Sequence, residues 1–278
     1  MSAHVDPSAP GFASIPVPAR QAKPRTRGIS MMIDWGMGLE RQRDTLESAG
    51  AYIDVAKVAA TIPRVMPRDY LKRKLDLYRA HDVTTSIGGL FVELTWKQRT
   101  YGALLDEARA LGFGAVEVSD NLLAFPPAEK AQAIRQCVDA GLKAYAEVGK
   151  KEGVLDDAAF VADIDTCLQA GAAAVFLEAY ELFGHGEVRS ALIAEITRRF
   201  PPERILYELP VTILPGVHRE FKHRITAWLV RELGTEVNLA NIEWDELYVT
   251  EMVRRGMAGD TSHPQGAYRL AGFEAGEP

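Results

Sequence analysis

Cysteine and histidine are scarce in this chain, and basic residues do not outnumber acidic ones. Among 278 residues there are 2 cysteines and 6 histidines, with 32 lysines and arginines against 38 aspartates and glutamates, a net charge of -6. Cys137 and Cys167 both lie in helix-like segments, which argues against a disulfide framework and against a nucleophilic thiol. No close histidine pair stands beside a strand end, so zinc is disfavoured. The acidic balance argues against nucleic acid or an anionic membrane and predicts a small-molecule substrate.

Long apolar runs are also missing from the sequence. No stretch approaches the roughly 20 apolar residues that a membrane span needs. Residues 1–27 lack the apolar core of a signal peptide and carry five prolines, which predicts a mobile N-terminal tail. We therefore expect a cytoplasmic protein with no membrane partner, while a homo-oligomer is left open.

What the chain does contain is a regular alternation of strand-like and helix-like segments. Glycines end five helix-like segments at intervals of about 30 residues or twice that, which is the length of one strand, one helix and two short connections. Eight short apolar runs occur in this rhythm, namely Ser30–Asp34, Tyr52–Lys57, Thr84–Gly88, Ala115–Ser119, Lys143–Val148, Ala174–Glu178, Ile205–Glu208 and Val237–Asn241. The pattern predicts an α/β fold, a single (β/α)8 TIM barrel over residues 28–262 with tails at 1–27 and 263–278. An open doubly wound sheet is disfavoured because no G-x-G-x-x-G motif follows a strand.

Acidic side chains end many of the predicted strands, where a barrel places its active site. Carboxylates that converge repel one another unless a cation or a proton lies between them, and a hard, oxygen-loving ion such as Mg²⁺ meets that need. Salt bridges with rim lysines or helix capping are the alternative explanation. The candidate metal ligands are Asp34, Glu117, Glu147, Glu178 and Glu208.

Lysines and small polar residues accompany these carboxylates. Lys57 ends an apolar run and needs an anionic partner if it is buried. Lys150 and Lys151 follow Gly149, and because a lysine beside another cation loses its proton more readily, this pair suits proton transfer. Two solvated loop lysines are the alternative. Further rim residues that we expect to contact the substrate are Gly88, Gly89, Ser119 and Asn241.

Several long strings in this order and spacing resemble the phosphosulfolactate synthase family, which also includes plant heat-stress relatives. The resemblance extends from about Arg27 to Thr261 and is carried by Met32-Ile33-Asp34, Tyr52-Ile53-Asp54-Val55-Ala56-Lys57, Gly88-Gly89 with Glu93, Val116-Glu117-Val118-Ser119-Asp120, Glu147-Val148-Gly149-Lys150-Lys151, Val237-Asn238-Leu239-Ala240-Asn241-Ile242, and Arg254-Arg255-Gly256 with Gly259-Asp260-Thr261. It implies a (β/α)8 barrel and a Mg²⁺-dependent lyase that adds sulfite to phosphoenolpyruvate, giving 2-phospho-3-sulfolactate through an enolate-like species. It further implies that Lys151 is the acid and that Lys57 helps to hold an anionic group.

The chain departs from the family pattern where that pattern carries basic residues. Trp35, Tyr180 and Ala258 stand at those positions, and Leu90 stands where the family tends to carry threonine. Two aromatic side chains in place of cations favour a pocket for a less charged or more apolar ligand, with Trp35 and Tyr180 as substrate contacts. Compensation by other basic residues would instead retain the family reaction. A barrel that binds a protein partner without catalysis is the third hypothesis.

Overall fold

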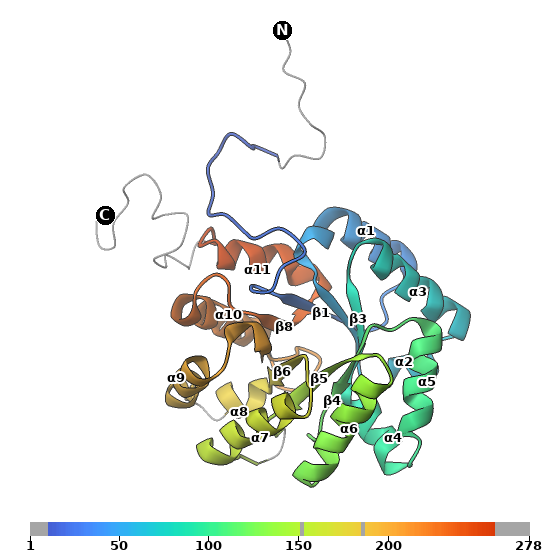
Figure 1. Cartoon of the computed structure of the whole chain (residues 1–278). Helices are drawn as coiled ribbons and strands as arrows, with labels where there is room; N and C mark the ends of the chain where they lie inside the picture. Colours follow the sequence, from blue (N-terminus) through green and yellow to red (C-terminus); the bar gives the residue numbers. More distant parts are fainter. Residues whose placement is uncertain (1–10, 151–152, 185–186, 259–278) are drawn as a thin grey trace.

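Eight parallel strands form a closed barrel in chain order (Figure 1). The structure is a computed structural model that describes residues 11–150, 153–184 and 187–258. Each strand pairs with the next and β1 pairs with β8, so the sheet has no free edge. The strands are β1 Ser30–Asp34, β2 Val55–Val58, β3 Thr84–Ile87, β4 Ala115–Val118, β5 Lys143–Val148, β6 Ala174–Leu177, β7 Ile205–Glu208 and β8 Leu239–Glu243. The predicted (β/α)8 barrel is confirmed.

Helices surround the strands and follow each of them in the chain (Figure 1). They are α1 Leu39–Ala49, α2 Ile62–Val65, α3 Arg68–Ala80, α4 Gly89–Lys97, α5 Tyr101–Leu111, α6 Pro127–Asp139, α7 Asp157–Gln169, α8 Ala179–Phe183, α9 Ser190–Arg199, α10 Arg219–Leu233 and α11 Leu247–Arg254. The repeating glycines mark helix ends, as Gly112 shows. It follows α5 with a φ of 93°, a left-handed conformation that glycine adopts at little cost. None of the helices in the described ranges is long and apolar enough to cross a membrane.

Side chains of each strand alternate between two cores. Outward side chains pack against the helices, whereas inward ones fill the barrel, namely Met31, Val55, Ala115, Tyr145, Ala174, Phe176, Leu206 and Ala240. The rings of Tyr145 and Phe176 stack with centroids 5.1 Å apart. This inner layer closes the middle of the barrel, so the space for a ligand lies beyond it, at the carboxyl ends of the strands.

Strand β8 begins and ends two residues later than expected and carries a bulge. Its pairing with β1 steps from Ser30 opposite Leu239 to Met32 opposite Ile242, so β8 has one extra residue in this interval. Asn241 has a φ of 60°, a left-handed conformation that asparagine tolerates better than most residues. The strand therefore does not end at Asn241, as the sequence suggested, but at Glu243.

The described part of the predicted N-terminal tail begins at residue 11, and its second half packs against the amino-terminal end of the barrel. The Nε of Arg20 lies 3.0 Å from a carboxylate oxygen of Glu251, and the Nε of Arg25 lies 3.0 Å from Asp54. Both arginine side chains are almost fully buried. These ion pairs join the segment that contains Arg20 and Arg25 to the barrel. The predicted C-terminal tail lies outside the described residues.

Candidate active site at the carboxyl end of the barrel

A pocket at the carboxyl end of the barrel receives the polar side chains that end the strands. Lys57 lies two residues after Val55, Glu117 two after Ala115, and the same step separates Glu147, Glu178 and Glu208 from Tyr145, Phe176 and Leu206. Since side chains two apart share one face of a strand, all five residues point inward above the apolar layer. All five are buried, and all five line the pocket.

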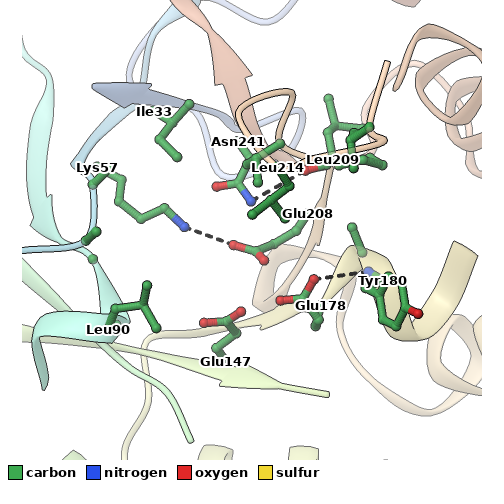
Figure 2. Close-up of a pocket in the computed structure, with 18 of the residues that line it drawn as sticks. Ile33, Lys57, Leu90, Glu147, Glu178, Tyr180, Glu208, Leu209, Leu214 and Asn241 are labelled. Carbon is green, nitrogen blue, oxygen red and sulfur yellow. Dashed lines mark hydrogen bonds and ion pairs between the residues drawn. The ribbon is translucent and has the colours of Figure 1, made fainter. Parts of the chain in front are cut away.

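Lys57 bridges two of the glutamates. Its Nζ lies 2.9 Å from Oε2 of Glu117 and 2.9 Å from Oε1 of Glu208, and Figure 2 shows the ammonium group pointing at Glu208. Burial alone would lower the pKa of Lys57, but attraction by Glu117, Glu208 and Glu147 outweighs burial and raises that pKa. Lys57 is therefore a fixed positive charge at neutral pH.

Three glutamates from adjacent strands form a compact carboxylate cluster, which we call the glutamate cluster. One oxygen each of Glu147, Glu178 and Glu208 lies within 4.8 Å of the others, and their side chains converge on one space in Figure 2. Burial raises the pKa of Glu208 well above its usual range; Lys57 opposes this rise, and the neighbouring carboxylates add to it. A buried, all-oxygen donor set with excess negative charge fits a hard divalent cation such as Mg²⁺.

Glu117 belongs to the same pocket but has other contacts. Its Oε1 accepts a hydrogen bond from the backbone N of Gly89, 2.8 Å away at the start of α4. A Cβ on Gly89 would lie 2.4 Å from Oγ of Ser119 and 3.0 Å from Oε1 of Glu117, so only glycine allows this approach. Burial raises the pKa of Glu117, and Lys57 partly offsets that rise. Gly88 and Gly89 line the pocket, and Gly89 also helps to hold Glu117 in place.

Asn241 reaches the pocket because of the bulge in β8. Ala240 points into the barrel, so regular alternation would turn the next side chain outward; the left-handed backbone instead allows both residues to face the barrel side. The Nδ2 of Asn241 lies 3.5 Å from the carbonyl oxygen of Leu209. Its Oδ1 is buried and has no hydrogen-bond partner within the part of the chain that the structure describes. This oxygen is available to a ligand.

Three other expected site residues lie outside the pocket. The side chain of Asp34 points outward from the barrel, towards α3. Its Oδ2 lies 2.9 Å from Nζ of Lys74 and accepts a hydrogen bond from the hydroxyl of Tyr78 at 2.7 Å. The structure therefore does not bring Asp34 to the glutamate cluster. Ser119 is fully buried and donates to Glu93. Lys150 pairs with Asp120 through its ammonium group. Lys151 lies outside the described residues, and its role stays a prediction.

The outer half of the pocket is apolar. Trp35 and Tyr180 line it, as expected from the sequence, and so does Leu90 at the start of α4. Sequence reasoning did not single out the segment after β7, which contributes Leu209, Pro210, Val211, Leu214 and Val217. The sequence signal that could have identified this segment as part of the pocket is its two prolines and its apolar run immediately after a strand-end glutamate. The pocket thus combines an acidic floor with a hydrocarbon wall.

Comparison with known proteins agrees with this architecture. A family model described as (2R)-phospho-3-sulfolactate synthase (ComA) matches residues 18–260. Phosphosulfolactate synthase of Methanothermobacter thermautotrophicus is 33% identical over 88% of this chain and 95% of its own length, and that of Methanocaldococcus jannaschii is 30% identical over 84% and 94%. The protein HEAT-STRESS-ASSOCIATED 32 of Arabidopsis thaliana is 22% identical over 79% of this chain and 83% of its own length.

Among solved structures, a DHDPS from Cyanidioschyzon merolae superposes with a TM-score of 0.54 at 12% identity, covering 88% of this chain and 79% of that one. A likeness at this level of identity shows the barrel fold alone. The match to the family model over nearly the whole barrel, together with the two relatives at 30% identity or more, shows more than the fold: this chain belongs to the phosphosulfolactate synthase family.

Proposed function

We propose that this chain is a Mg²⁺-dependent lyase that adds sulfite to phosphoenolpyruvate, giving 2-phospho-3-sulfolactate. The observation that carries the proposal is the glutamate cluster: three buried carboxylates, within 4.8 Å of one another, at the active-site end of a barrel from this family. Such a cluster binds a divalent cation well and is costly to keep without one. When bound, Mg²⁺ would stabilise negative charge that develops on the substrate carboxylate.

The reaction needs a nucleophile, a charge sink and a proton. The sulfur lone pair of sulfite forms a bond to the terminal carbon of the enol phosphate, and the electrons of the carbon–carbon double bond move towards the carboxylate. The central carbon then takes up one proton, so that no other bond breaks and no redox partner is needed. The chain must therefore supply a cationic environment for the anions and one acid beside the central carbon.

The three lysines take different roles in this proposal. Lys57 keeps its proton because of its raised pKa, and it orients Glu117 and Glu208 from between them. Lys150 is paired with Asp120 and anchors the segment that follows β5. Lys151, which the resemblance to the family implies as the acid, is the proposed proton donor.

The test combines turnover with metal removal. Purified protein is mixed with phosphoenolpyruvate, sulfite and Mg²⁺, and the product is followed by ³¹P NMR and mass spectrometry. We expect 2-phospho-3-sulfolactate, its loss with EDTA and its recovery with added Mg²⁺. Lys151→Ala should reduce turnover by about 100-fold or more, because general acids contribute that much. Absence of product at millimolar reactants and Mg²⁺ would reject these reactants.

A second candidate function is favoured by the apolar wall of the pocket. Among the described residues that line it, Lys57 is the one cation, and two glutamates already face that ammonium group. Trp35, Leu90 and Tyr180 offer area for a hydrocarbon group instead. On this proposal the same metal and enolate chemistry acts on a less anionic acid with an apolar substituent.

The two candidates are separated by binding measurements with Mg²⁺ present. Calorimetric titration compares phosphoenolpyruvate with pyruvate, 2-oxohexanoate and phenylpyruvate. The second candidate predicts affinity that rises with the apolar substituent and falls on Tyr180→Ser. The first predicts that phosphoenolpyruvate binds most tightly and that Tyr180→Ser has little effect.

A further inference from the structure

Asn121 does not line the pocket but contacts two members of the glutamate cluster. Its side chain is buried, and its Nδ2 donates to Oε1 of Glu147 and lies 3.4 Å from Oε2 of Glu178. Because an ionised carboxylate only accepts hydrogen bonds, the amide nitrogen must face both glutamates. One uncharged donor group therefore joins side chains from the ends of β5 and β6.

Glu93, a buried acid in α4, holds Asn121 in place. The carboxylate of Glu93 accepts the backbone N–H groups of Asn121 at 2.9 Å, Leu122 at 2.9 Å and Leu123 at 2.8 Å, and the hydroxyl of Ser119. Three successive N–H groups on one carboxylate fix the course of the segment after β4. The Asn121 side chain is thus presented by rigid structure and not by a free loop.

An uncharged donor is suited to this position. Glu147 and Glu178 repel each other, and a lysine between them would neutralise the charge that attracts a cation. A carboxamide lowers the repulsion through its N–H groups but leaves the net charge unchanged. Its own Oδ1 is buried and lacks a hydrogen-bond partner among the residues that the structure covers. The carboxamide therefore directs its Nδ2 at Glu147 and Glu178, and as an uncharged donor it does not replace a cation at the glutamate cluster.

We infer that Asn121 is a positioning residue that holds Glu147 and Glu178 ready for a divalent cation, with Glu93 fixing Asn121 in turn. The inference rests on the proposed function for the identity of the ligand. It does not rest on the reactants, since Asn121 is not among the residues that line the pocket. Partners in the layer behind metal ligands commonly change metal affinity by 10–100-fold when they are removed.

The experiment titrates Mn²⁺, as a probe for the cation, into the full-length protein and follows free Mn²⁺ by electron paramagnetic resonance. We expect Asn121→Ala to weaken Mn²⁺ binding about 10-fold or more and to broaden the spectrum of bound Mn²⁺. Leu122→Ala is the matched control: this side chain is on the same segment but exposed, and its backbone bond to Glu93 survives, so affinity should stay at the wild-type value. Equal affinity of Asn121→Ala and wild type would overturn the inference.

A second readout needs no metal. Asn121→Asp replaces the donor with a further carboxylate, so the metal-free protein should melt at a lower temperature than Asn121→Ala, and added Mn²⁺ should raise its melting temperature more than that of wild type. If wild type binds no Mn²⁺, the metal proposal fails, but the metal-free comparison still decides the role of Asn121. Equal melting temperatures of metal-free wild type, Asn121→Ala and Asn121→Asp would show that the amide group positions nothing.

Discussion

The two ends of this barrel both bury charges, but they balance them differently. At the amino-terminal end, guanidinium groups face carboxylates and backbone carbonyls: Arg20 meets Glu251 and the carbonyl of Gly28, and Arg254 donates to the carbonyls of Thr235 and Val237. At the carboxyl end, carboxylates outnumber the cation among the described pocket residues. Buried charges are paired at the amino-terminal end, whereas negative charge is in excess among the described pocket residues at the carboxyl end.

This difference separates structural from functional burial. A buried cation that donates to fixed carbonyls needs no further ligand, so the amino-terminal end stabilises the closed sheet and the docked segment around Arg20. In contrast, burial and the neighbouring carboxylates raise the pKa of Glu208 well above its usual range, so the glutamate cluster is unfavourable until a cation or a proton arrives. The same degree of burial therefore predicts loss of stability on mutation at one end and loss of ligand binding at the other.

The largest effect is expected for Glu208→Gln. Removing one carboxylate from the glutamate cluster should lower Mn²⁺ affinity and reduce turnover by about 100-fold or more. The metal-free protein should keep or increase its melting temperature, because a neutral amide removes the cost of burying the charge and the repulsion by neighbouring carboxylates, which together raise the pKa of Glu208. Turnover assays check the predicted loss of function, and thermal melting of the metal-free protein checks the predicted stability. A melting temperature lowered by several degrees would mean that this end is structural as well.

Arg254→Met should have the opposite profile. The Arg254 side chain is fully buried, and its Nη1 donates to the carbonyl of Thr235 at 2.9 Å. Breaking such a network by removing one partner typically costs about 3–5 kcal/mol, measurable by urea unfolding. Arg224→Met is the control, since Arg224 is exposed and pairs with exposed Glu220, and it should change stability by less than about 1 kcal/mol. Mn²⁺ affinity reduced in folded Arg254→Met would contradict the separation of the two ends.

The barrel could be predicted from the sequence because its strands are short apolar runs in a regular rhythm. Because these runs are apolar throughout, the sequence does not show which side chains point into the barrel and which point towards the helices. In the run Ser30–Asp34 every position is buried, so nothing in the letters shows that Asp34 faces α3 while Ile33 faces the pocket. The expectation that Asp34 belongs with the strand-end glutamates assumed that the last side chain of every predicted strand points into the barrel.

Asn241 and Asn121 show two further limits. The sequence places Asn241 near a strand end, but its inward direction depends on a bulge that only the pairing of β1 with β8 reveals. Asn121 joins Glu147 and Glu178, which are 26 and 57 residues away in the chain. Contacts of this kind follow from the closure of the barrel and not from any local pattern.

Gly89→Ala should have an intermediate effect at the acidic end. The new Cβ would lie 2.4 Å from Oγ of Ser119, so α4 or β4 must shift, at a cost of about 1–3 kcal/mol and with weaker Mn²⁺ binding as Glu117 moves. Gly102→Ala is the matched control. Gly102 lies within α5 with open space around its Cβ position, so alanine there should stabilise the protein by about 0.5–1 kcal/mol. Urea unfolding of both variants decides whether the close approach, and not the loss of glycine as such, carries the effect.

The smallest effect concerns the buried thiol of Cys137 in α6, whose pKa burial raises to about 12. The folded protein then keeps a proton that the unfolded chain releases above pH about 9, so stability should fall as pH rises from about 9 towards 12. The loss is expected to be about 1 kcal/mol at pH 10 relative to pH 8. Cys137→Ala should lose less stability over the same interval, as measured by urea unfolding, and iodoacetamide should not label the native thiol at pH 9. Equal pH dependence of wild type and variant would show that the thiol is not protected by burial.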